Sequence, residues 1–455
     1  MKTTKTGNGN TTVSNRPEWW LAGQQQAKAR YEALPMPKRK DEAWRFASVQ
    51  NLDLAPYQPA VSVSDAERAR ILEASVMCFE AAGHAVFAND QLLSFQGAND
   101  ELQKKGVIFE PISEALAKHP ELLKKHFMEQ PVVLGSEKFA ALHRAQCNNG
   151  ILLYVPKNVQ VKLPLAAWHW LSGANGAVFP HTLIIAEANS EVTFTDFYRS
   201  LDEQPGLAVS VTDLLVGDGA KVNYLCCQSW SEQALSFQLC STLVGKDAYA
   251  KSLNFNLGGI FSRIESHSRL AGTGARSEML GLSVCHGKQE FDQRTLQDHL
   301  APNAWSDLLY KNALNHRAKS IFEGLIKVEV GAKQTDAYQT NRNLLLSGDA
   351  EADSMPGLEI ANDDVKCSHG ATTGQISSEE LFYMLQRGIP RHEANYLISV
   401  GFTEEVLERF GNAEINEQLR EMIADKFRRG KNVKVEAAGD EAIDETNVRS
   451  LQGTV

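Results

Sequence analysis

Short segments in which apolar and polar residues alternate fill the middle of the chain, from about residue 131 to residue 364. Apolar side chains occupy every second position in parts of VQVKLPL (159–165), EVTFTDF (191–197) and IKVEV (326–330). Successive side chains of a strand point to opposite faces, so this period of two predicts strands with one face in a core and the other toward water. The helical connections of an α/β sheet are missing here, and the region is therefore predicted to be mainly β.

A turn built from small residues recurs between these predicted strands, as in VGDGAKV, VGKDAYA and APNAWSD. Its six copies align on Ser190, Ala220, Ala248, Ala275, Ala304 and Ala332, with spacings of 30, 28, 27, 29 and 28 residues. A unit of roughly 28 residues cannot bury its apolar face alone, whereas stacked copies share one core. The spacing predicts a solenoid of β-coils. Because Gly/Asp/Ala turns are common in all β-rich proteins, a β-sandwich is the main alternative.

Helical patterns flank this core, which is predicted to span residues 131–375. Residues 17–130 carry apolar residues at spacings of three and four and are predicted to form an α-rich domain. Residues 376–435 are predicted to form a small helical domain: Ser377 and Glu380 make a capping box, Thr403 is placed to cap a further helix, and an apolar stripe follows. The stripe consists of Ile415, Leu419, Met422, Ile423 and Phe427.

The two helical regions are expected to cap the ends of the solenoid, because a terminal coil exposes backbone and apolar side chains. Residues 1–16 and 436–455 are polar or acid-rich without a period, and both segments are predicted to be disordered.

Composition excludes several classes of protein. The chain has 455 residues, which is long enough for two or three domains, and it contains no apolar run of the roughly 20 residues that a transmembrane helix needs. Its net charge of −10 would repel nucleic acid. The seven cysteines form no CxxC pair, so we expect free thiols in a reducing compartment and, without an apolar leader, a cytoplasmic protein.

The sequence DDVKCSHGATTGQ (363–375) holds the most conspicuous candidate site. On an extended segment, Cys367 and His369 point to the same side with Cα atoms about 6.5 Å apart, so both can reach one metal or sulfur species. A protonated His369 is expected to lower the pKa of the Cys367 thiol. Two donors do not complete a zinc or iron-sulfur site, and on spacing alone such a pair is more often incidental than a pair of ligands.

Other motifs carry less. The segment GLSVCHGKQ (281–289) differs from a phosphate-binding loop in glycine spacing and has Gln289 where Ser or Thr should stand, so we expect no nucleotide to be bound by this chain. Asp292, Asp298 and His299 are candidates for an acid/base group in a cleft, against the simpler interpretation that they are solvated loop residues.

Two segments resemble one known family. VKCSHGATTGQISSEELFYMLQRGIPRHEA (365–394) is similar to the C-terminal signature of the SufD branch of the SufB/SufD family, whose members belong to an iron-sulfur cluster assembly complex. LPMPKRKDEAWRFASVQNLDL (34–54) resembles the entry segment of the same family. SufB members typically carry Glu-His-Glu-Ala where this chain has Lys366 to His369, which favours the SufD branch.

The resemblance implies a right-handed parallel β-helix between two helical domains. It also implies pairing with a SufB-like paralogue along the β-helix and docking of a SufC-like ABC ATPase on the C-terminal helical domain. In isolation, the chain is expected to be able to form a homodimer.

As to function, the resemblance implies a non-catalytic scaffold on which a transient iron-sulfur cluster assembles at the interface with SufB, coupled to ATP hydrolysis by SufC. His369 is then the ligand from this chain, and Cys367 is a second ligand or a thiol that tunes the site; flavin binding is left open. The competing interpretations are a β-helix carbohydrate-active enzyme, which would need a carboxylate pair in a groove, and a purely structural partner of SufB.

Overall fold

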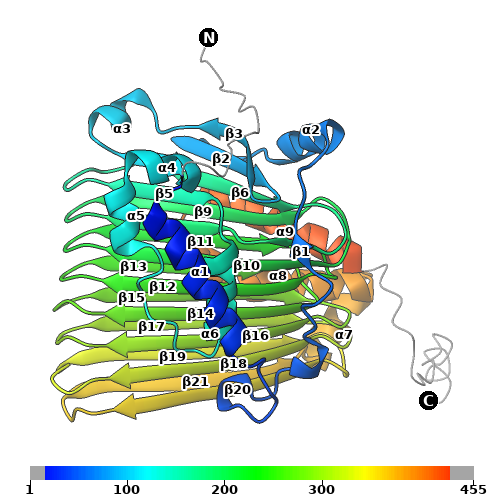
Figure 1. Ribbon diagram of the computed structural model, residues 1–455. Helices are drawn as coiled ribbons and strands as arrows, with labels where there is room; N and C mark the ends of the chain where they lie inside the picture. The colour runs from blue at the N-terminus through cyan, green and yellow to red at the C-terminus, as the bar shows by residue number, and fades with distance from the viewer. Residues whose placement is uncertain (1–15, 431–455) are drawn as a thin grey trace, which may run out of the picture.

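The computed structural model describes residues 16–430, so the predictions for residues 1–15 and 431–455 lie outside it. The chain winds into a β-solenoid of about 8 turns, and each turn adds one strand to each of two sheets (Figure 1). Strands of neighbouring turns pair in parallel, which excludes the β-sandwich. The predicted fold class, a β-helix core with helical regions before and after it in the sequence, is confirmed.

The two sheets are named sheet A and sheet B. Sheet A contains β1 (Gln58–Pro59), β4 (Ile108–Pro111), β5 (Gly150–Val155), β7 (Gly176–Val178), β8 (His181–Ala186), β10 (Gly206–Val216), β12 (Leu235–Val244), β14 (Phe261–Leu270), β16 (Glu290–His299), β18 (Lys319–Val328) and β20 (Glu351–Ile360). Sheet B contains β2 (Gly83–Ala88), β3 (Gln91–Gln96), β6 (Leu165–Leu171), β9 (Glu191–Ser200), β11 (Lys221–Ser229), β13 (Tyr249–Asn256), β15 (Arg276–Cys285), β17 (Trp305–Leu314), β19 (Thr335–Leu345) and β21 (Val365–Gln375). Strands β1 to β4 therefore come from the range predicted as α-rich.

The strand register reproduces the predicted repeat for all steps but the last. In sheet B, Lys221 pairs with Tyr249, Tyr249 with Arg276 and Arg276 with Trp305, which are steps of 28, 27 and 29 residues. The next step is 31 residues, because Trp305 pairs with Asp336. The predicted alignment of Ala304 with Ala332 is therefore wrong by three residues, since the last turn is longer than the others.

A residue in the left-handed conformation precedes the buried small residue of each turn. Asn189, Asp247 and Asn303 adopt φ values of 58°, 51° and 58°, and glycines do so in the turns between them. The backbone N–H of each such residue donates to the turn of the next coil, as from Asn303 to the Lys333 oxygen at 2.8 Å. Asn, Asp and Gly tolerate this conformation, which explains why these residue types recur at this point of the sequence.

Replacing Asn303 by alanine is expected to lower the free energy of unfolding by about 1 kcal/mol, because alanine pays the left-handed penalty without local hydrogen bonding. Asn303→Gly is the matched control and should be close to neutral. The side chain of Asn303 is exposed, so few other contacts are lost. Urea unfolding of the three proteins measures the difference, and equal midpoints for the alanine and glycine variants would contradict this account of the turn.

The N-terminal helices cover the outer face of sheet A. They are α1 (Glu18–Ala33), α2 (Asp65–Ala74), α3 (Asp100–Lys104), α4 (Ile112–Lys118), α5 (Pro120–His126) and α6 (Glu137–Gln146), with short 3-10 turns at Glu42–Trp44 and Val49–Asn51. Helices α1 and α6 run side by side across the strands (Figure 1). Phe139 of α6 stacks on Phe237 of β12 at 3.7 Å between ring centroids, and Trp44 packs beside both.

The C-terminal helices α7 (Ser378–Gln386), α8 (Arg391–Phe410) and α9 (Ala413–Gly430) follow β21, and α8 and α9 pack on the outer face of sheet B. Of the predicted stripe, Ile415, Leu419 and Ile423 are buried there. Ser377 caps α7 as predicted. The cap predicted at Thr403 is wrong, because α8 continues through it and its hydroxyl donates to the Val400 oxygen at 2.8 Å. Across residues 16–430, no helix combines the length and apolar character needed to cross a bilayer.

The helices therefore cover the faces of the solenoid, and the prediction that they cap both ends is wrong at the C-terminal end. Covering the faces also buries both sides of strands such as β10 and β14, which were expected to have one wet face. In contrast, most residues of β20 and β21 are partly or fully exposed. Among the described residues no further strand pairs with either one, so the last coil is an open end (Figure 1).

Candidate functional site

Cys367 and His369 lie on β21, the edge strand of sheet B at the open end of the solenoid. Their register partners on β19 are Ala337 and Gln339, both buried in the interior of the preceding coil. Cys367 packs against Ala337 and its apolar neighbours, and it is half-buried, whereas His369 is exposed. Residues two apart on a strand share a face, so the thiol and the imidazole both point toward the solenoid interior at its uncovered mouth.

The electrostatic surroundings of Cys367 differ from the expectation. Burial raises the pKa of its thiol, and the carboxylate of Asp336 on the neighbouring strand raises it further. The prediction that His369 lowers the pKa of Cys367 is therefore wrong for the chain by itself. A thiol in this state is a poor nucleophile and binds a metal only when the metal displaces its proton.

Alkylation of Cys367 by iodoacetamide is expected to be slow at pH 8 and to rise about tenfold per pH unit between pH 8 and pH 9, because the thiolate fraction follows a raised pKa. Peptide mass spectrometry over a time course at each pH measures this rate, and Cys367→Ser identifies the labelled peptide. A rate independent of pH above 7 would show a depressed pKa and contradict the prediction.

A column of buried polar side chains fills the interior of the last coils. Gln293 donates to Asn312 at 3.0 Å and Asn312 donates to Asn343 at 2.8 Å. Asn343 donates in turn to the hydroxyl of Thr373 on β21 at 3.2 Å. The interior of the earlier coils is apolar, with Phe194 and its neighbours. His369 thus stands at the mouth of a polar channel of side chains, where an ionic species is stabilised better than in an apolar core.

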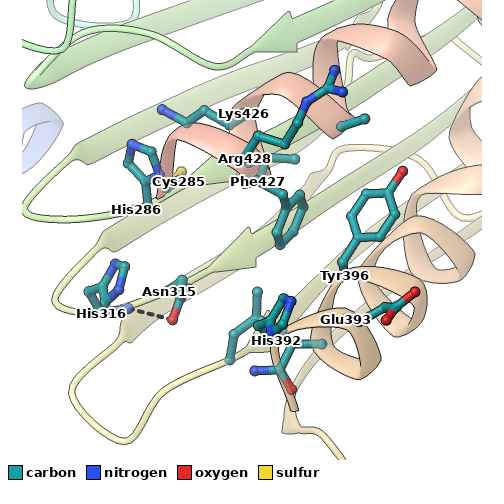
Figure 2. A pocket seen from close by; sticks show the side chains of 14 residues that line it. Cys285, His286, Asn315, His316, His392, Glu393, Tyr396, Lys426, Phe427 and Arg428 are labelled. Atoms are coloured by element: carbon teal, nitrogen blue, oxygen red, sulfur yellow. Dashed lines mark hydrogen bonds between the residues drawn. The ribbon is translucent and has the colours of Figure 1, made fainter. Parts of the chain in front are cut away.

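A second concave site lies between α8, α9 and the turns that follow β15 and β17 (Figure 2). It is a cavity of about 540 Å³ that receives three histidines and two aromatic rings: His286, His316, His392, Tyr396 and Phe427. Burial by itself would raise the pKa of the neighbouring Glu232, but His286 and Lys426 hold it at about 2. Glu232 thereby neutralises much of the positive charge of the wall and ties α9 to sheet B.

The other predicted residues do not form a site. Asp292 is buried on the outer face of β16, where it pairs with Arg263 and Arg294. Asp298 shares that face further along the strand, whereas His299 points the other way and bonds to the Ser306 hydroxyl at 2.8 Å. Both interpretations, an acid/base group and solvated loop residues, are therefore wrong. Gly281 lies inside β15, where no phosphate loop can form, in agreement with the rejection of that motif.

One group of potential ligands was not predicted. His143, Cys147 and His181 come together in the buried layer between α6 and sheet A, and they are the single set of three or more clustered donors found within residues 16–430. The spacing of four between His143 and Cys147 was the available signal, because it places both on one side of a helix. His181 is distant in sequence and carried no such signal.

Comparison with known proteins agrees with this architecture. The chain matches the SUF system FeS cluster assembly SufBD core domain over residues 169–402 and the SufBD protein N-terminal region over residues 12–166. It is 31% identical over 423 residues to the iron-sulfur cluster assembly protein SufD of Bacillus subtilis (strain 168), covering 90% of this chain and 95% of that protein. An iron-sulfur cluster assembly SufBD family protein of Staphylococcus aureus (strain USA300) is 27% identical, with 87% and 86% covered. The chain therefore belongs to the SufBD family of iron-sulfur cluster assembly proteins.

Proposed function

We propose that this chain is the SufD-like, non-catalytic scaffold of a cytoplasmic assembly complex, in which a transient iron-sulfur cluster forms at its interface with a SufB-like subunit. The observation that carries the proposal is the position of His369 and Cys367 on the uncovered edge strand β21. A second subunit docked there would meet both side chains. The seven free thiols agree with a reducing compartment.

The open end of the solenoid supports pairing with a subunit of the same fold. The exposed strands β20 and β21 present unpaired backbone donors and acceptors, which add a further strand readily. A SufB-like β-helix placed end to end would continue both sheets and would enclose the polar interior. The same edge can accept a second copy of this chain, which accounts for the expected homodimer in isolation.

The C-terminal helices support docking of a SufC-like ATPase. Helix α7 contains no buried residue, and Phe382 and Tyr383 are 60% and 58% exposed. Leu385 on α7 and Leu397 on α8 are also exposed. Apolar side chains gathered on neighbouring short helices are typical of a protein interface. ATP hydrolysis by a partner bound here would move the helices that follow β21 directly and could thereby open the cluster interface.

The number of donors supports a shared site. His369 and Cys367 provide two ligands, whereas iron in a cluster requires more, and the clustered group at His143 lies elsewhere. The missing ligands would come from the partner. The polar interior behind His369 would give a charged intermediate a hydrogen-bonding environment.

The test is to co-express the chain with its SufB-like and SufC-like partners, purify the complex without oxygen, and measure iron and acid-labile sulfide. His369→Ala is expected to lower both several-fold, and Cys367→Ala to lower them less, because the first ligand is lost outright. Ser368→Ala is the matched control on the same strand, since its side chain points to the other face.

Complex formation must be measured alongside, by size-exclusion chromatography. Intact complexes with unchanged iron and sulfide in both site variants would reduce this chain to a structural partner. Loss of iron in the Ser368→Ala variant as well would show that damage to β21, rather than loss of a ligand, causes the effect.

A further inference from the structure

The group formed by His143, Cys147 and His181 has the geometry of a metal site. His143 lies on α6 and Cys147 caps its C-terminal end, while His181 opens β8 on the outer face of sheet A. All three are fully buried. Their donor atoms lie within 4.8 Å of one another, and His143 Nε2 lies 3.2 Å from His181 Nδ1. Two nitrogens bound to one tetrahedral zinc at about 2.0–2.1 Å stand about 3.3 Å apart.

The outer nitrogen of each ring faces an acceptor. His143 Nδ1 lies 2.7 Å from the Val209 carbonyl oxygen, and His181 Nε2 lies 3.6 Å from Asp213 Oδ2. Asp213 is itself fixed by the backbone N–H of Met128 at 3.1 Å. A carbonyl or carboxylate behind each ring is the arrangement that orients metal-binding histidines in proteins.

The protons of the two rings favour a cation between them. With N–H groups directed at Val209 and Asp213, two lone pairs face each other at 3.2 Å, which is repulsive unless a cation lies between them. The alternative is a hydrogen bond from His181 to His143. That tautomer leaves His181 Nε2 as a bare buried lone pair against a carboxylate, and this atom has no hydrogen-bond partner.

The surrounding charges fit a bound dication. Burial raises the pKa of the Cys147 thiol and the nearby Asp90 raises it further, whereas Arg144 and Arg16 lower it. Arg144 is also a like charge to any cation at the two histidines. The carboxylate of Asp213 and a metal-bound Cys147 thiolate would offset that charge, because a coordinating thiol is deprotonated by the metal.

We propose that His143, Cys147 and His181 bind one divalent cation of zinc type, as a structural site that fixes α6 to sheet A. Imidazole and thiolate donors select zinc over magnesium or calcium. The complete burial of the ligands indicates a metal incorporated during folding rather than one exchanged in use. The site lies on the early strands β8 and β10, many coils before β21, and it does not depend on the proposed cluster interface.

The full-length chain, expressed alone, tests the proposal. After folding in medium supplemented with zinc, the purified protein is expected to hold about one zinc per chain by elemental analysis. After expression with cobalt instead, its absorption spectrum should show tetrahedral d–d bands and a thiolate-to-cobalt charge-transfer band. Cys147→Ser should lose the charge-transfer band, and His181→Asn should lose stoichiometric metal.

Two controls locate the metal. Cys227→Ser removes another buried thiol from sheet B, and Cys367→Ser removes the thiol of β21; both variants should keep the cobalt spectrum. The wild-type spectrum decides the question even where a ligand variant does not fold. A folded wild-type chain without stoichiometric zinc or cobalt, a cobalt spectrum without a thiolate band, or a band that survives in Cys147→Ser would each overturn the proposal.

Discussion

A proline at position 371 is expected to prevent the chain from pairing with its SufB-like partner while leaving the chain folded. In sheet B, the backbone N–H of Asp336 donates to Ala304 of the preceding coil, and Lys366 is its register partner on β21. Because the direction alternates along a strand, the N–H groups of even-numbered residues of β21 point to β19 and those of odd-numbered residues point to the free edge. Ala371 is exposed near the middle of that edge.

Ala371→Pro removes an edge donor and places the ring in the path of an incoming strand, so affinity should fall at least tenfold, or about 1.4 kcal/mol. The internal ladder keeps its bonds, and thermal unfolding of the chain alone should change little, since edge strands tolerate proline. Pull-down with the tagged partner measures the association. Ala371→Ser, which keeps the donor, is the control; undiminished binding of the proline variant would show that the partner docks elsewhere.

Replacing Arg263 by methionine is expected to destabilise the chain by roughly 3–5 kcal/mol, because it leaves buried carboxylates without their counter-charge. Arg263 is 1% exposed and donates to Asp292 at 2.5 Å and to Glu265 at 2.9 Å. It also bonds to the Leu134 oxygen and stacks on Trp44 at 4.0 Å. These contacts join the N-terminal segments to sheet A.

The deficit of Arg263→Met should shrink as the pH is lowered. Burial already raises the pKa of Glu265, and loss of Arg263 raises it further. A carboxyl whose folded pKa exceeds its unfolded value costs stability as pH rises above the unfolded pKa, so the loss is largest near pH 8 and smaller near pH 5. Denaturant unfolding at both pH values measures it. The control is Arg276→Met, an exposed arginine stacked on Trp305, expected to cost less than about 1 kcal/mol; similar losses for the two variants would contradict the assigned role.

The solenoid could be predicted because its turns are local chemistry. A left-handed Asn, Asp or Gly followed by a buried small residue is visible in the sequence, and so is its recurrence. The longer turn before Thr335 broke the count, since Ala332 is also small and buried but is not the equivalent residue. The placement of the helices was not predictable in this way, because an amphipathic stripe does not say which apolar face it covers.

The candidate site was predictable only in part. The shared direction of Cys367 and His369 follows from strand periodicity, and the strand register agrees with it. The pKa shift of Cys367 was predicted with the wrong sign, because its burial and the neighbour Asp336 depend on the adjacent coil. For the same reason the group at His143 was missed: it joins a helix to a strand whose contact is set by packing.

The unpaired strands β20 and β21 also have a consequence for the abundance of the two subunits. Since one surface would take either a SufB-like chain or a copy of this chain, the two assemblies compete by mass action. A cell that makes this protein in excess would accumulate the symmetric form at the expense of the productive one. Balanced synthesis of both chains, such as translation from a common transcript, would keep the edge matched to its proper neighbour.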